Sequence, residues 1–144
     1  MNTFIVKYAA FVNALAFVIL IATGNFFCSS PIIIIAQIFA FVFILYSRIS
    51  FGKQEFSVTA VPGSGPLVQR GPYKLIRHPL YAGVLLLLWV SIIGHWKILT
   101  VLIGLIDTVG IIWRINLEER LLRERYPEYA DYASRTKKVI PYIY

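Results

Sequence analysis

Charged residues and cysteine are both scarce in this chain of 144 residues. Only 15% of the residues are charged, whereas about 25% is typical of a soluble domain. The single cysteine, Cys28, can form no internal disulfide and cannot supply a cysteine-based metal site. The sequence also contains no internal repeat and no low-complexity tract. We therefore expect neither a disulfide-stabilised fold nor a metal centre.

Apolar residues, in contrast, are abundant. They make up 58% of the chain, against about 45–50% in an average soluble protein, and the mean hydropathy is +0.72. A chain of this length is sufficient for one domain. The composition therefore predicts an integral membrane protein that forms a single domain over residues 1–144.

Four apolar segments predict the helices of an all-α fold. They lie at about 3–23, 31–50, 79–93 and 98–126. Because a spanning helix needs roughly 20 residues, about four transmembrane helices are expected. Segment 79–93 is shorter, so the sequence leaves open whether the hairpin that it forms with the next segment crosses the bilayer fully. The first segment shows no clear cleavage site, so we expect a retained helix rather than a signal peptide.

The distribution of basic residues predicts the orientation in the membrane. The connection at 24–30 carries no charge and that at 94–97 carries only Lys97, whereas the central loop at about 51–78 and the tail at 114–144 are rich in Lys and Arg. The positive-inside rule places this loop, the tail and both termini in the cytoplasm. The net charge of +7 is thereby explained by membrane orientation, and no nucleic-acid partner is expected. The helical start of the tail should break near Tyr126-Pro127, because the residue before a proline resists helical geometry.

A first polar cluster precedes the third apolar segment, in the stretch RGPYKLIRHPLYAG at 70–83. Pro79 suits the first turn of a helix, where its missing N–H has no consequence. The free amides of that turn favour an anionic group, and Tyr73 and Tyr81 offer aromatic faces that attract cations. The alternative is an interfacial anchor, in which Arg, His and Tyr simply lie at the level of the lipid headgroups.

A second polar cluster follows the fourth apolar segment and contains Arg114, Glu118 and Glu119. On a helix, both glutamates flank an apolar stripe, which is unusual for a merely solvated surface. The alternative is a row of surface ion pairs four residues apart, each contributing only about 0.2–0.5 kcal/mol. Asp107, inside the fourth apolar segment, is either functional or structurally paired, and the sequence does not decide between the two.

Together the two clusters resemble the isoprenylcysteine carboxyl methyltransferase and phospholipid methyltransferase family of integral-membrane methyltransferases. The first motif is G-x-Y followed by R-H-P-x-Y-x-G, here at 71–83. The second is an arginine, a Glu-Glu pair and E-Y-x-x-Y ending near I-P, here between residues 114 and 141. The resemblance spans about residues 65–141 and implies methyl transfer from S-adenosylmethionine to a lipid-like or prenylated acceptor at the cytoplasmic face.

The resemblance also implies roles for individual residues. Arg114 would position the substrate. If the acceptor is a carboxylate, no general base is needed, whereas an amine must lose a proton, for which Glu119 or His78 is the candidate base. Two other functions stay open: a membrane NADPH-dependent reductase of the sterol type and a non-enzymatic membrane scaffold. The residues implied to bind the cofactor are Leu67, Val68, Tyr73, His78, Pro79, Leu80, Tyr81 and Glu118.

Overall fold

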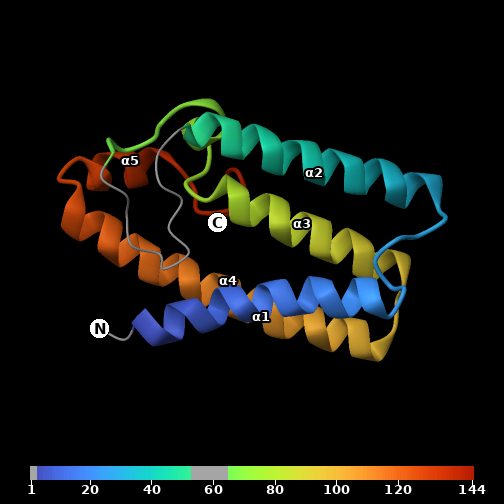
Figure 1. The fold of residues 1–144 in the computed structure, drawn as a ribbon. Coiled ribbons are helices and arrows are strands. Elements are labelled where there is room, and N and C mark those ends of the chain that lie inside the picture. Colours follow the sequence, from blue (N-terminus) through green and yellow to red (C-terminus); the bar gives the residue numbers. More distant parts are fainter. Residues whose placement is uncertain (1–2, 53–64) are drawn as a thin grey trace.

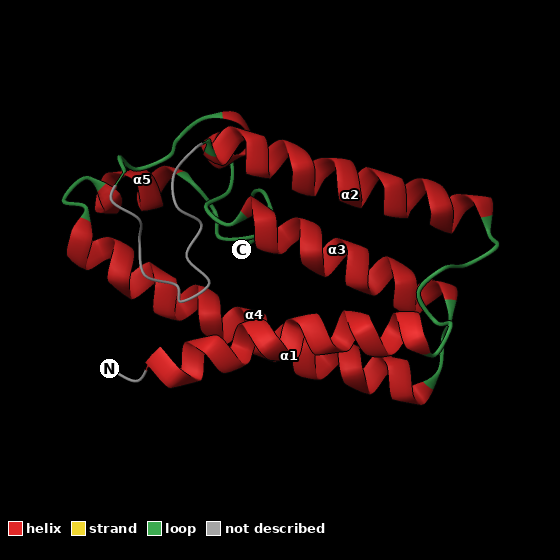
Figure 2. Cartoon of the chain, in the orientation of Figure 1, coloured by secondary structure: helices red, strands yellow, loops and turns green. Residues whose placement is uncertain are grey.

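The computed structural model describes the backbone of residues 3–52 and 65–144, and the side chains of residues 11–52 and 65–144. Within these residues the fold is helical (Figure 2). The elements in chain order are α1 (Thr3–Ala22), α2 (Pro31–Phe51), a 3₁₀ turn (Gly71–Lys74), α3 (Pro79–Gly94), α4 (Ile98–Arg125) and α5 (Tyr129–Arg135). The all-α expectation is confirmed for the described chain.

The four long helices run alternately in opposite directions along one bundle (Figure 1). Helix α2 packs against α3, α1 packs against α4, and α3 also contacts α4. The connections at 23–30 and 95–97 lie at one end of the bundle. The segment before α3, the end of α4, helix α5 and the C-terminus lie at the other (Figure 1). The two polar motifs are therefore brought to the same end.

Helix ends follow local sequence signals closely. Pro31 and Pro79 occupy the first turns of α2 and α3, where a proline needs no N–H partner. Gly52 follows α2 with a φ of 83°, a left-handed value that glycine adopts without strain. Helix α4 ends before Tyr126, directly ahead of Pro127, as the sequence predicts.

Small residues and polar side chains join the helices. A Cβ atom on Gly83 of α3 would lie 2.5 Å from Ile44 Cγ1, so glycine permits the close approach of α2. Asn13 of α1 donates a hydrogen bond of 2.9 Å to Oδ2 of Asp107, which is 2% exposed. Asp107 is therefore structurally paired, and its hydrogen bond with Asn13 joins α4 to α1.

Two described helices, α2 and α4, are long and apolar enough to cross a membrane, against the four that the sequence predicts. Helix α3 has 16 residues, or about 24 Å at 1.5 Å per residue, short of the roughly 30 Å of a hydrocarbon core. The side chains of α1 are described from Phe11 onward, and the stretch Phe11–Ala22 is apolar. Large apolar side chains such as Ile32, Ile49 and Ile106 are more than 60% exposed, which suits a lipid environment.

Candidate active site

The site lies where α3 begins, and the tail of the chain fixes its backbone. The amide of Arg77 donates to the carbonyl of Lys137 at 2.8 Å, and that of His78 donates to Lys138 at 2.9 Å. Within the described residues, the one β-type pairing is a parallel bridge between Ile76 and Lys137. This pairing fixes the backbone at Arg77 and His78 and therefore the directions in which their side chains point.

Glu119 of α4 lies buried at the centre of a polar cluster. Its Oε1 accepts hydrogen bonds from Arg77 Nε at 2.6 Å, the Tyr129 hydroxyl at 2.8 Å and His78 Nε2 at 3.1 Å. The side chains of Arg77 and Glu119 are only 8% and 7% exposed. An exposed Arg123, one turn further along α4, lies 3.8 Å from Oε2. Surface ion pairing therefore describes the Arg123 contact but not the three buried ones.

His78 is buried between two carboxylates. Its Nε2 faces Glu119, and its Nδ1 forms an ion pair with Oε2 of Glu118 at 3.5 Å. Burial lowers the pKa of His78, but the hydrogen bonds that its ring donates to Glu118 and Glu119 outweigh this effect and hold the pKa above the ordinary value of 6.5. Protonation of the imidazole is thereby favoured, and in the protonated ring both N–H groups donate. A headgroup anchor does not describe this buried side chain.

Tyr81 joins Glu118 to Arg114. The Tyr81 hydroxyl donates to Glu118 Oε1 at 2.9 Å and accepts from Arg114 Nε at 2.6 Å. The guanidinium carbon of Arg114 also lies 5.7 Å from the centre of the Tyr81 ring. Hydrogen bonds and ion pairs thus form one continuous network, which runs through Arg77, Glu119, His78, Glu118, Tyr81 and Arg114.

The tail helix α5 is tied to this network. Arg77 Nη1 donates to the carbonyls of Ala133 at 3.0 Å and Thr136 at 2.5 Å. The Tyr132 hydroxyl donates to the carbonyl of Tyr73 at 2.7 Å. Burial raises the pKa of Tyr132, so its phenol stays protonated and remains a donor. The tail is therefore part of the wall of the site.

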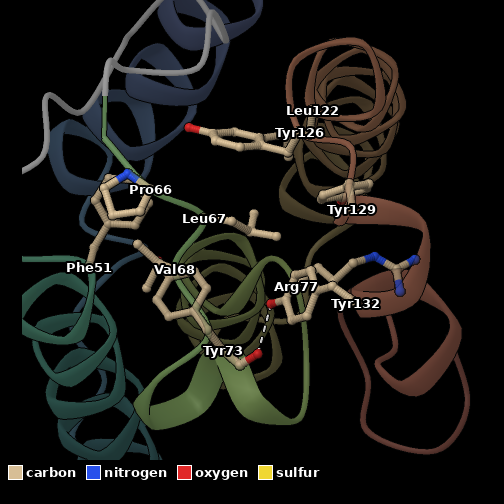
Figure 3. A pocket seen from close by; sticks show the side chains of 10 residues that line it. All are labelled: Phe51, Pro66, Leu67, Val68, Tyr73, Arg77, Leu122, Tyr126, Tyr129 and Tyr132. Atoms are coloured by element: carbon tan, nitrogen blue, oxygen red, sulfur yellow. Dashed lines mark hydrogen bonds between the residues drawn. The ribbon is translucent and has the colours of Figure 1, made fainter.

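An aromatic pocket adjoins the polar network (Figure 3). It contains about 460 Å³ of empty space, counting the part open to solvent. Side chains from the end of α2, the segment before α3 and the α4–α5 region surround it (Figure 3). Its lining residues are Phe51, Pro66, Leu67, Val68, Tyr73, Arg77, Leu122, Tyr126, Tyr129 and Tyr132.

Most of the residues predicted from sequence fall into two neighbouring groups, and Pro79 and Leu80 lie outside both. Leu67, Val68 and Tyr73 line the pocket itself. Pro79 is buried at the start of α3, and Leu80 follows it half-buried. The remaining predicted residues belong to the polar network: His78, Tyr81, Arg114, Glu118 and Glu119. Their roles toward a ligand stay predictions.

Several site residues were missing from the sequence prediction. Arg77 stands inside the R-H-P motif, yet its contacts with both Glu119 and the tail were not expected. Tyr129 and Tyr132 belong to the E-Y-x-x-Y motif, but no pocket role was given to them. Their spacing of three residues on a short helix, which brings both rings to one face, was the available signal.

The sequence profile of the phospholipid methyltransferase family matches residues 15–129. This match covers well over half of the chain and contains the R-H-P-x-Y and Glu-Glu motifs. The chain belongs to the phospholipid methyltransferase family. The match begins within α1, so family similarity extends well before residue 65, where the resemblance of the motifs began.

One curated protein gives a partial match. The cobalt-zinc-cadmium resistance protein CzcN of Cupriavidus metallidurans is 37% identical over 76 residues. The aligned region is 52% of this chain but only 35% of the relative. No solved structure matches the chain significantly. Within the part of the chain that the structure describes, no group of three or more His, Cys, Asp or Glu side chains could hold a metal ion.

Proposed function

We propose that this member of the phospholipid methyltransferase family transfers a methyl group from S-adenosylmethionine to a lipophilic acceptor at the cytoplasmic face of a membrane. The observation that carries the proposal is the pairing of an aromatic pocket with a buried polar network at the end of the bundle where the basic segments lie. Both family motifs contribute to this one place.

The residues present fit the chemical groups of this cofactor. Tyr73, Tyr126 and Tyr129 give the pocket aromatic faces that suit an adenine ring and a sulfonium cation. Glu118, 19% exposed, offers a carboxylate to an ammonium or to ribose hydroxyls.

S-adenosylmethionine, when bound, supplies a methyl group activated for displacement. The contribution of the protein is to position the reactants and to exclude water. Tyr81 and Arg114 are held together by the 2.6 Å hydrogen bond, which fixes the guanidinium beside Glu118. Tyr81 packs against buried apolar side chains that include Ile111 and Ile115 of α4, and these side chains exclude water from that side of the ring.

The role proposed for Arg114 indicates which chemical groups the acceptor carries. A guanidinium binds a carboxylate or a phosphate through paired hydrogen bonds, so Arg114 suits either an isoprenylcysteine-like carboxylate or the phosphate of a phospholipid headgroup. A carboxylate accepts a methyl group without a base. A headgroup amine must first lose a proton.

The membrane arrangement belongs to the same proposal. The alternating directions of α1 to α4 (Figure 1) support four crossings by one domain over residues 1–144, with the short α3 spanning in contact with its longer neighbours. The basic loop and tail favour the cytoplasmic side for the site and both termini. The partners are then membrane lipids and a lipid-like or prenylated substrate, with no nucleic acid.

Binding measurements test the cofactor. We expect S-adenosylhomocysteine to bind the detergent-purified protein in calorimetry, and Glu118→Gln and His78→Ala to weaken that binding at least about tenfold. Glu124→Gln, the same change at an exposed site of α4, should leave binding unchanged. Binding of NADPH instead would indicate the reductase, and binding of neither would indicate the scaffold.

Activity measurements test the acceptor. With labelled S-adenosylmethionine, we expect transfer to one member of a panel of prenylcysteine, phosphatidylethanolamine and small lipophilic acids. Arg114→Ala should abolish transfer while binding of S-adenosylhomocysteine persists. If both are lost equally, Arg114 belongs to the cofactor pocket and its assignment to the acceptor is wrong.

A further inference from the structure

Glu118 and Glu119 are neighbours on α4 but have different surroundings. Glu119 is 7% exposed and its Oε1 accepts three hydrogen bonds. Glu118 is 19% exposed. A proton added to Glu119 would weaken charge-assisted bonds to two cations, which are the strong class of hydrogen bond. Glu119 is therefore unsuited to act as a general base, and its contacts point to another role.

We propose that Glu119 is a positioning residue: its carboxylate, fixed by Arg77 and Tyr129, holds the imidazole of His78 so that Nδ1 faces Glu118. The inference deepens the proposed function and rests on it, because Glu118 and His78 are the residues assigned to the cofactor. Glu119 acts on the cofactor only through His78.

Geometry and charge support this role. Both ring nitrogens of His78 are directed at carboxylates, at 3.1 and 3.5 Å. The imidazolium so favoured attracts Glu118 and limits the positions that its carboxylate can take. Replacing Glu119 by a neutral side chain removes one anion from the imidazole of His78. It also leaves the positive charge of Arg77 without this partner, and both effects disfavour the imidazolium. The titratable and charged groups around His78 are Arg77 from its own segment, Tyr81 from α3, Glu118 and Glu119 from α4, and Tyr129 from α5, which acts through Glu119.

Nitrogen NMR of the imidazole groups tests the proposal directly. The chain has two histidines, so a His95→Gln background leaves the signals of His78 alone. We expect Glu119→Gln to lower the titration midpoint of His78 by about one pH unit or more. Glu119→Asp, which keeps the charge but withdraws the carboxylate, should lower it by less, and it serves if Glu119→Gln does not fold. Glu124→Gln, on the exposed face of α4, should not change it.

Calorimetry with S-adenosylhomocysteine supplies the second measurement. At a pH below the measured His78 midpoints of both proteins, the wild type and Glu119→Gln should bind with similar affinity, because His78 is charged in both. At a pH between the two midpoints, His78 is still charged in the wild type but has lost its proton in Glu119→Gln, so the affinity of the variant should be at least about tenfold lower there. A merely structural role would lower affinity equally at both values.

Two results would overturn the proposal: an unchanged His78 midpoint in both Glu119 variants, or a loss of affinity that is independent of pH. Failure of the proposed function gives a different result. If the wild type binds no S-adenosylhomocysteine at either pH, the cofactor assignment is wrong, whereas the shift of the His78 midpoint still reports whether Glu119 controls the imidazole.

Discussion

Replacing Tyr129 with phenylalanine removes one buried hydrogen bond and little else. The Tyr129 side chain is 0% exposed, and its hydroxyl donates to Glu119 Oε1 at 2.8 Å. Phenylalanine keeps the ring and its edge contact with Tyr132, at 5.9 Å between centroids. Glu119 retains Arg77 and His78, so no buried acceptor is left without a donor. The loss is that of one hydrogen bond to a charged group, about 1.5–3 kcal/mol.

Unfolding in mixed micelles measures this difference. The chain contains three tryptophans, whose fluorescence reports unfolding as the fraction of denaturing detergent rises. We expect the free energy of unfolding of Tyr129→Phe to be about 1.5–3 kcal/mol below that of the wild type. Tyr142→Phe is the matched control: Tyr142 is 86% exposed, so the change should stay within about 0.5 kcal/mol. If Tyr129→Phe is as stable as the control, the phenol does not stabilise the buried carboxylate, and the description of the network is wrong.

Three further changes test other contacts. The pKa of His78 is raised, so its contribution to stability is complete below about pH 6.5 and is lost as the pH rises through the pKa of His78 in the folded protein. The free energy of unfolding should show this decline, and His78→Asn should remove it. Gly83→Leu should separate α2 from α3 and lower stability by about 1–3 kcal/mol, whereas Gly110→Ala, with open space around it, should be neutral or stabilising in a thermal melt. Asn13→Leu should cost about 1–3 kcal/mol by removing the donor to Asp107, and the double change with Asp107→Leu should recover part of that loss in the same melt.

The helices could be predicted from sequence because their limits are local. Pro31 and Pro79 have fixed φ angles that suit a first helical turn, and Pro127 ends the preceding helix by steric conflict. Each signal acts on its immediate neighbours, so no knowledge of the fold is needed. The predicted limits accordingly agree with the observed ones to within about a residue.

The tail contacts could not be predicted in this way. Lys137 and Lys138 accept hydrogen bonds from Arg77 and His78 through main-chain carbonyls, and a carbonyl carries no side-chain signature. Arg77 therefore resembled an exposed basic residue at a membrane surface. Only the three-dimensional placement of α4 and α5 against the segment before α3 shows that its charge is buried and matched by Glu119.

Burial of this ion pair has a consequence for the tail as a whole. A buried charge is tolerated only with a close partner and further hydrogen bonds, and Arg77 obtains them from Glu119 of α4 and from the carbonyls of Ala133 and Thr136 in the tail. Undocking the tail would leave the guanidinium with Glu119 alone, and it would also remove Tyr129 from that carboxylate. Docking of α5 and fixation of Glu119 are therefore one event. The geometry of His78 therefore depends on helix α5 through Glu119, whose carboxylate contacts both the imidazole and the hydroxyl of Tyr129.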